Sequence, residues 1–166
     1  MTGDDPGERS HVVFTIGHGH DDFGAFAQRC AGQGIRTIVD VRSEPYSSHA
    51  PDFTKARLEA ICAATGLGYR WLGRTLGGRP SDPELLDAQG RPDPDRVRVA
   101  PGFAGGLAEV EGLVATGPLA ILCAELDPDR CHRTTLIAPE LVALGYRVVH
   151  IVADGSTRPY QPPLGW

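Results

Sequence analysis

The chain has 166 residues, a formal net charge of −5 at pH 7 and 41% hydrophobic residues. This length fits a single globular domain with its own core, and the acidic balance argues against a protein that coats nucleic acid through bulk charge. No apolar run approaches the roughly 18 residues of a membrane span, and residues 1–10 lack the basic and apolar regions of a signal peptide. We therefore expect a cytoplasmic protein with no membrane partner.

Strand-like apolar runs alternate with helical patterns along most of the chain. The runs lie at 11–16, 35–41, 67–72, 119–123 and 146–152, and four helical patterns separate them. This order predicts an α/β fold, a three-layer sandwich with a mostly parallel central sheet of about five strands. We expect residues 1–10 to be disordered, 11–153 to form one domain with a long loop at 73–101, and 154–166 to form an irregular tail.

The stretch from Leu119 to Leu144 carries the densest group of reactive side chains. An apolar run ends at Cys123 and Glu125, an acidic turn follows, and a helical pattern begins with the sequence CHR at 131–133. Ligands of open α/β sheets bind beyond the carboxyl ends of parallel strands, where loops and helix N-termini meet. We therefore place the candidate site at this edge of the sheet.

Cys131 is the candidate nucleophile, with His132 beside it for acid–base chemistry. Asp127 and Pro128 form a typical helix start, which places Cys131 near a first helical turn where a thiolate is favoured. The alternative is that Cys131 is a small buried residue packing the helix on the sheet. Cys123 ends an apolar strand and is better explained as core.

Two carboxylates are candidates for proton transfer or for binding a hydroxyl. Glu125 follows the central strand, and Asp40 interrupts an otherwise apolar strand two residues before Arg42. Paired carboxylates favour glycosyl-bond or group-transfer chemistry over redox chemistry. The alternative is structural: Glu125 neutralises a nearby arginine, and Asp40 and Arg42, which share one strand face, clamp each other.

Arginines supply the donors for an anionic ligand. Arg42 and Arg133 are the candidate anion-binding residues, and His18 is a further candidate. A local basic site on this acidic chain has six candidate members, which are Arg42, Arg70, Arg74, Arg79, Arg130 and Arg133. The sequence has no Walker loop or GxGxxG pattern at these positions, and Cys123 to Arg130 is one residue too long for the CxxxxxR loop of cysteine phosphatases.

Four segments together resemble the bacterial domain-of-unknown-function 488 family. They are TIGHG at 15–19, DVRSEPYS at 40–47, LGYRWLGRTLGG at 67–78 and LCAELDPDRCHR at 122–133. The resemblance implies an α/β fold and no established reaction. Its motif positions correspond here to Gly17, His18, Asp40, Arg42, Pro45, Ser47, Gly77, Gly78, Cys123, Glu125, Cys131, His132 and Arg133. Ser47, Gly77 and Gly78 join the candidate ligand-binding residues on this basis, and Gly19 departs from the family pattern, which usually has Ser there.

These residues favour a hydrolase or group transferase that acts on a small anionic or nucleotide-like ligand, without a cofactor or metal. A metal site that combines Cys123, Cys131 and either His132 or His18 is disfavoured, because the adjacent residues Cys131 and His132 would project differently from a helix. Two alternatives stay open: a non-catalytic module that binds a ligand or nucleic acid, and a thiol or metal sensor that uses Cys123 and Cys131. The sequence gives no indication of the oligomeric state.

Overall fold

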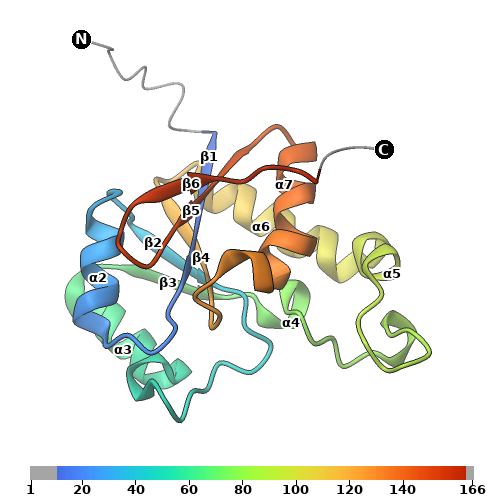
Figure 1. Cartoon of the computed structure of the whole chain (residues 1–166), viewed down its shortest axis with the longest axis horizontal. Coiled ribbons are helices and arrows are strands. Elements are labelled where there is room, and N and C mark those ends of the chain that lie inside the picture. Colours follow the sequence, from blue (N-terminus) through green and yellow to red (C-terminus); the bar gives the residue numbers. More distant parts are fainter. Residues whose placement is uncertain (1–10, 164–166) are drawn as a thin grey trace.

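The computed structural model describes residues 11–163 and contains one six-stranded sheet in the order β3-β2-β4-β1-β5-β6 (Figure 1). The strands are β1 (Val12–Gly17), β2 (Thr37–Asp40), β3 (Gly68–Trp71), β4 (Leu119–Cys123), β5 (Arg147–Ile151) and β6 (Thr157–Pro159). The first five are parallel, and β6 pairs with β5 in the antiparallel direction. The mostly parallel α/β sheet expected from the sequence is therefore confirmed.

Helices cover both faces of this sheet and create two separate cores. The helices that pack on β4 are α2 (Phe23–Ala31), α3 (Lys55–Thr65), α6 (Pro101–Val114) and α7 (Ala138–Ala143). The residues of β4 alternate between the two cores: Ala120 and Leu122 pack with α2 and α3, whereas Leu119 and Ile121 pack with α6 and α7. Figure 1 shows α2 and α3 on one side of the strands and α6 and α7 on the other. This alternation directs the next odd-numbered side chain, Cys123, toward the α6 and α7 side.

The order of the strands places a topological switch point between β2 and β4. After β2 the chain continues into α3 on one face, and after β4 it continues into α7 on the other. Because the two strands are parallel neighbours, their carboxyl ends lie side by side while the segments that follow them diverge. In open α/β sheets such a divergence creates the crevice in which ligands bind.

The segment 73–101, expected to be a long loop, contains three short helices. They are α4 (Gly73–Leu76), the 3-10 helix η2 (Pro83–Leu85) and α5 (Pro94–Val99). Asp82 and Asp93 each cap one of these helices by accepting a backbone N–H, and a proline follows each aspartate. These local caps give the segment structure without an apolar periodicity.

The C-terminal tail is also more regular than expected because it contributes β6 to the edge of the sheet. Pro159 lies in this strand, and an edge is where a sheet tolerates a residue without an N–H group. The predicted disorder of residues 1–10 and the last three residues of the predicted tail lie outside the described residues. Within residues 11–163 no helix is long and apolar enough to cross a lipid bilayer.

The connection from β4 to α7 differs from the single capped helix that the sequence predicts. Asp127 caps only the short 3-10 helix η3 (Pro128–Arg130), and Cys131 follows in an extended conformation with φ −133° and ψ 147°. The chain then enters a π-helical turn, η4 (Arg133–Ile137), which leads directly into α7. Pro139 lies in the first turn of α7, directly after the π-helical turn.

Arg133 fixes the loop that joins β4 to this turn. Its side chain is fully buried, and its guanidinium donates hydrogen bonds to the backbone carbonyls of Glu125 at 2.6 Å and Leu126 at 3.1 Å. Carbonyl groups in a loop need such donors when they are withdrawn from water. Arg133 therefore supplies the hydrogen bonds that a regular secondary structure would otherwise supply.

We expect Arg133→Leu to lower the free energy of unfolding by about 1–3 kcal/mol, since two carbonyls lose their buried donors. Arg70→Leu is the control, because Arg70 is exposed and pairs only with exposed Glu109. Its change should stay within about 0.5 kcal/mol. Urea denaturation followed by circular dichroism measures both values. Equal stability of Arg133→Leu and the wild type would show that the loop does not depend on Arg133.

Alanine substitutions at two adjacent glycines of α6 should change the stability of the protein in opposite directions. A Cβ atom at Gly106 would collide with Thr75 and Leu76 of α4, whereas a Cβ atom at Gly105 would meet no atom within 4 Å. Gly105→Ala should therefore raise the free energy of unfolding by about 0.5–1 kcal/mol through helix propensity. Gly106→Ala should lower it by about 1–3 kcal/mol through overpacking. Thermal denaturation of the two variants checks the sign, and changes of the same sign would contradict the close packing of α4 on α6.

Candidate functional site

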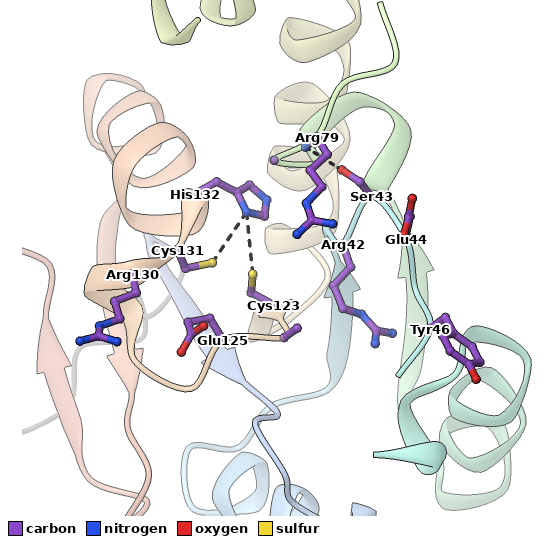
Figure 2. Close-up of a pocket in the computed structure, with 12 residues that line it drawn as sticks. Arg42, Ser43, Glu44, Tyr46, Arg79, Cys123, Glu125, Arg130, Cys131 and His132 are labelled. Atoms are coloured by element: carbon purple, nitrogen blue, oxygen red, sulfur yellow. Dashed lines mark hydrogen bonds between the residues drawn. The ribbon is translucent and has the colours of Figure 1, made fainter. Parts of the chain in front are cut away.

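A pocket of about 460 Å³ lies at the carboxyl ends of β2 and β4, at the switch point. Its volume is in the range of small-molecule binding sites. It is lined by Arg42, Ser43, Glu44, Tyr46, Gly78, Arg79, Cys123, Ala124, Glu125, Arg130, Cys131 and His132 (Figure 2). The prediction that the β4 edge carries a site thus corresponds to a real concavity.

Cys123, Cys131 and His132 form a compact cluster at this pocket. The Nδ1 atom of His132 lies 3.8 Å from Cys123 Sγ and 3.7 Å from Cys131 Sγ, as Figure 2 shows. The opposite ring nitrogen, Nε2, is buried and has no hydrogen-bond partner within residues 11–163. The imidazole therefore interacts through one nitrogen with both sulfur atoms.

The two thiols of this cluster are electrostatically unequal. A hydrogen bond from the Cys131 thiol lowers the pKa of Cys123, and His132 and Arg133 lower it further. The pKa of Cys131 is raised, first because its thiol donates this hydrogen bond and second because it is buried. The surroundings therefore favour the thiolate form at Cys123 over Cys131.

This assignment reverses the roles predicted for the two cysteines. The sequence favours Cys131 as the thiolate because it places that residue in a helical turn, and it favours Cys123 as core. Cys131 is extended instead, so its sulfur turns back toward the end of β4. The exposed fractions of Cys123 and Cys131 are only 7% and 6%, yet both residues line the pocket.

The convergence of Cys131 and His132 also corrects the argument against a metal site. Their ligand atoms and the Cys123 sulfur all lie within 4.8 Å of one another. Neighbouring residues diverge on a regular helix, but here the first residue is extended and the second begins the helical turn. The three side chains can therefore face one common point.

Three of the six arginines considered from the sequence line the pocket: Arg42, Arg79 and Arg130. The exposed guanidinium of Arg79 makes no hydrogen bond or ion pair with any part of residues 11–163. Figure 2 shows it extending between His132 and Arg42 toward the sulfur atoms. Arg130 lies 3.8 Å from Asp127 and its guanidinium points away from the sulfur atoms. Arg79 is thus the cation with the most freedom to bind a ligand.

Asp40 and Arg42 form a buried clamp on the α2 and α3 side of the sheet. Arg42 Nε and Nη2 donate to the two carboxylate oxygens of Asp40 at 2.8 and 2.7 Å, and the Tyr69 hydroxyl donates to the same group at 2.6 Å. Asp40 is fully buried and does not line the pocket. The structural alternative, a clamp between Asp40 and Arg42, is therefore present, and a role of Asp40 in proton transfer stays a prediction.

His18 belongs to this clamp and not to the pocket wall. Its Nδ1 lies 2.8 Å from the Gly19 carbonyl, so Nδ1 carries the proton and the lone pair of Nε2 faces Arg42 Nη1 at 3.4 Å. Burial lowers the pKa of His18, in accord with a neutral ring. The ring also stacks on Phe53 with 4.5 Å between centroids. His18 positions Arg42, and the predicted direct contact with an anion is not supported.

Three other predicted ligand-binding residues lie outside the pocket lining. The Arg133 guanidinium donates hydrogen bonds to the loop carbonyls. Ser47 Oγ accepts a hydrogen bond from the N–H of Ala50 at 3.0 Å, and Gly77 packs against Ser43. Gly78 does line the pocket, and a Cβ atom there would meet the His132 ring at 2.8 Å.

Glu125 lines the pocket with an exposed carboxylate, but no second carboxylate from Asp40 faces it. The predicted structural ion pair of Glu125 is also absent among residues 11–163. Sequence reasoning missed Ser43 and Glu44, which follow β2 directly. Their position after a strand end was the available signal, since the residues that follow Arg42 must cross the same edge.

Comparison with known proteins identifies the family but no characterised relative. No curated protein and no solved structure matches the chain. One family, described as "Domain of unknown function DUF488", matches residues 23–138. The match spans strands β2 to β4 and includes every residue of the sulfur–imidazole cluster. The chain belongs to the DUF488 family.

Proposed function

We propose that the protein is a hydrolase or group transferase that acts on a small anionic or nucleotide-like ligand in the pocket at β2 and β4. One observation carries this proposal: the guanidinium of Arg79, which has no partner within residues 11–163, extends into the same pocket as the Cys123, Cys131 and His132 cluster. A cation without a protein partner and a group of reactive side chains thus share one concave site.

Anion binding follows from how the arginines are held. The side-chain donors of Arg79 bond to no group in the described part of the chain, and a guanidinium fits phosphate or carboxylate oxygens in pairs. Arg42 contributes a fixed edge of the pocket because Asp40 and His18 hold its side chain. Glu44 and Glu125 lie on the same walls, so a ligand that combines an anionic group with hydroxyls or an amine suits the pocket better than a bare anion.

The sulfur and imidazole groups supply the chemistry. Cys123 can act as a nucleophile, and His132 can accept or deliver a proton because its Nδ1 faces both sulfurs. These groups and the anion-binding Arg79 line the same cavity, so a ligand held by Arg79 presents its neighbouring atoms to them. A two-carboxylate glycosidase mechanism loses its basis because Asp40 is locked to Arg42.

A nucleic-acid binding module is less well supported. Such proteins track a phosphate backbone with a stripe of exposed cations. Here the arginines surround a pocket, two glutamates interrupt them, and exposed Arg70 is paired with Glu109. This arrangement favours a ligand of limited size.

Alkylation with charged and neutral reagents tests the anion site. In reduced, chelator-treated protein, iodoacetate should modify the pocket thiols faster relative to iodoacetamide than it modifies free cysteine, because the pocket attracts the carboxylate. Arg79→Ala should lower this rate ratio about threefold to tenfold, and inorganic phosphate should slow only the iodoacetate reaction. Arg70→Ala is the matched control and should behave as the wild type. Peptide mass spectrometry locates the modified residue.

A rate ratio that is the same in wild type and Arg79→Ala would contradict the anion site. The catalytic half of the proposal needs turnover: nucleoside phosphates and sugar phosphates incubated with the wild type should yield products detectable by mass spectrometry. Cys123→Ser should abolish this turnover. Phosphate competition without turnover of any of these compounds would reduce the function to binding.

A further inference from the structure

We propose that Cys123, Cys131 and His132 form a binding site for one Zn²⁺ ion, with a coordination position open to the pocket. The proposal goes beyond anion binding and does not depend on it, because it stands on the three side chains alone. It corresponds to the sensor alternative considered from the sequence only in using the same sulfurs. Here the metal would be a resident part of the site.

The spacing of the ligand atoms fits a tetrahedral zinc ion. With Zn–S bonds of about 2.3 Å and Zn–N bonds of about 2.0–2.1 Å, tetrahedral angles separate neighbouring ligand atoms by roughly 3.5–3.8 Å. The observed distances from His132 Nδ1 to the two sulfurs are 3.8 and 3.7 Å, and the whole set lies within 4.8 Å. Only a small approach of the sulfurs is then needed to enclose the ion.

The three ligands are held in place before any ion binds. Cys123 ends the central strand β4, and Cys131 is fixed by its extended backbone and by the Arg133 N–H, which lies 3.5 Å from its sulfur. Gly78 packs against the His132 ring. An N–H donor to a ligating sulfur is a hydrogen bond of the kind that orients ligands in metal sites.

The charge and softness of the ligands select the kind of ion. Two thiolates cancel the charge of a divalent cation, so the metal adds no net charge beside Arg79. Binding releases one proton from each thiol that is still protonated. Sulfur and imidazole ligands favour Zn²⁺ over Mg²⁺ or Ca²⁺, which prefer oxygen ligands.

The site has the ligand number of a catalytic zinc centre. Structural zinc sites are closed by four protein ligands, whereas catalytic sites keep three protein ligands and one open position. Within the described residues the cluster contains three such side chains, and all three line the pocket. The open position therefore faces the space where Arg79 would hold an anionic ligand.

Cobalt substitution tests this site directly. The 166-residue chain is first reduced and stripped of metal with a chelator. Thiol titration then shows that its 4 cysteines are free thiols. One equivalent of Co²⁺ should then produce thiolate–Co²⁺ charge-transfer absorption and the intense visible bands of a tetrahedral ion. One equivalent of Zn²⁺ should remove both.

Variants assign the ligands. Cys123→Ser, Cys131→Ser and His132→Ala should each weaken Co²⁺ binding at least about 100-fold, since even loss of an outer-shell contact costs 10–100-fold in metal sites. Cys62→Ala is the matched control, because Cys62 is a buried thiol in the opposite core, and it should bind as the wild type does. Circular dichroism confirms that each variant is folded.

No tetrahedral spectrum in the reduced wild type would overturn the proposal, as would equal binding by Cys62→Ala and Cys123→Ser. The competition between phosphate and iodoacetate is measured on metal-free protein, so its result does not depend on whether the zinc site exists. Lost metal binding with intact phosphate competition would overturn the zinc site alone, and the converse would overturn the anion site alone.

Discussion

The hydrogen bonds from the Arg133 guanidinium to the carbonyls of Glu125 and Leu126 hold the candidate site together. They fix the loop after β4 so that Cys131 returns to the end of the strand that carries Cys123. These partners are neutral, so they accept hydrogen bonds from Arg133 without cancelling its charge, and its buried Nε atom has no partner within residues 11–163. A full positive charge therefore remains buried near the two sulfurs, where it lowers the pKa of Cys123 and opposes the rise in the pKa of Cys131.

Arg42 is the opposite case, and the contrast divides the edge of the sheet into two parts. The carboxylate of Asp40 neutralises Arg42 through two short hydrogen bonds, and the neutral ring of His18 occupies another side of the guanidinium. Breaking such a buried pair leaves an uncompensated charge, so the clamp is rigid. On the α2 and α3 face the positive charge of Arg42 is neutralised by Asp40. On the other face the charge of Arg133 is not neutralised by its carbonyl partners. The pocket lies where these two faces meet.

The layers of this fold can be predicted from the sequence, because a strand that is buried on both faces of the sheet is a continuous run of apolar residues. The apolar run of β4 alternates between two cores, and the same two-residue period correctly places Asp40 and Arg42 on one face. Short elements leave a weaker record. Asp82-Pro83 and Asp93-Pro94 start helices of one or two turns that no apolar periodicity reveals, and Asp127-Pro128 starts a 3-10 helix and not the longer helix expected.

The direction of long side chains was the main obstacle to predicting the site itself. Arg133 and Arg79 are both arginines beside the strand edge, but a guanidinium can reach several ångströms in any direction that packing allows. The spacing of residues in the sequence does not reveal that Arg133 turns inward to backbone carbonyls. Nor does it reveal that the Arg79 side chain has no partner within residues 11–163. Cys131 and His132 converge for a similar reason: one residue of extended backbone before the helical turn redirects a side chain that a regular helix would point elsewhere.

Metal and anion binding would reinforce each other in this pocket if both proposals hold. A zinc ion bound by two thiolates and an imidazole has no net charge, but its open position still accepts an oxygen ligand. An anionic group held by Arg79 beside that position would gain a bond to the metal, and by linkage the anion would tighten metal binding by the same factor. The two thiols then need not serve as nucleophiles. In that arrangement the buried charge of Arg133 keeps both sulfurs ready to bind the ion, and Glu125 is the carboxylate on the pocket wall that can receive a proton.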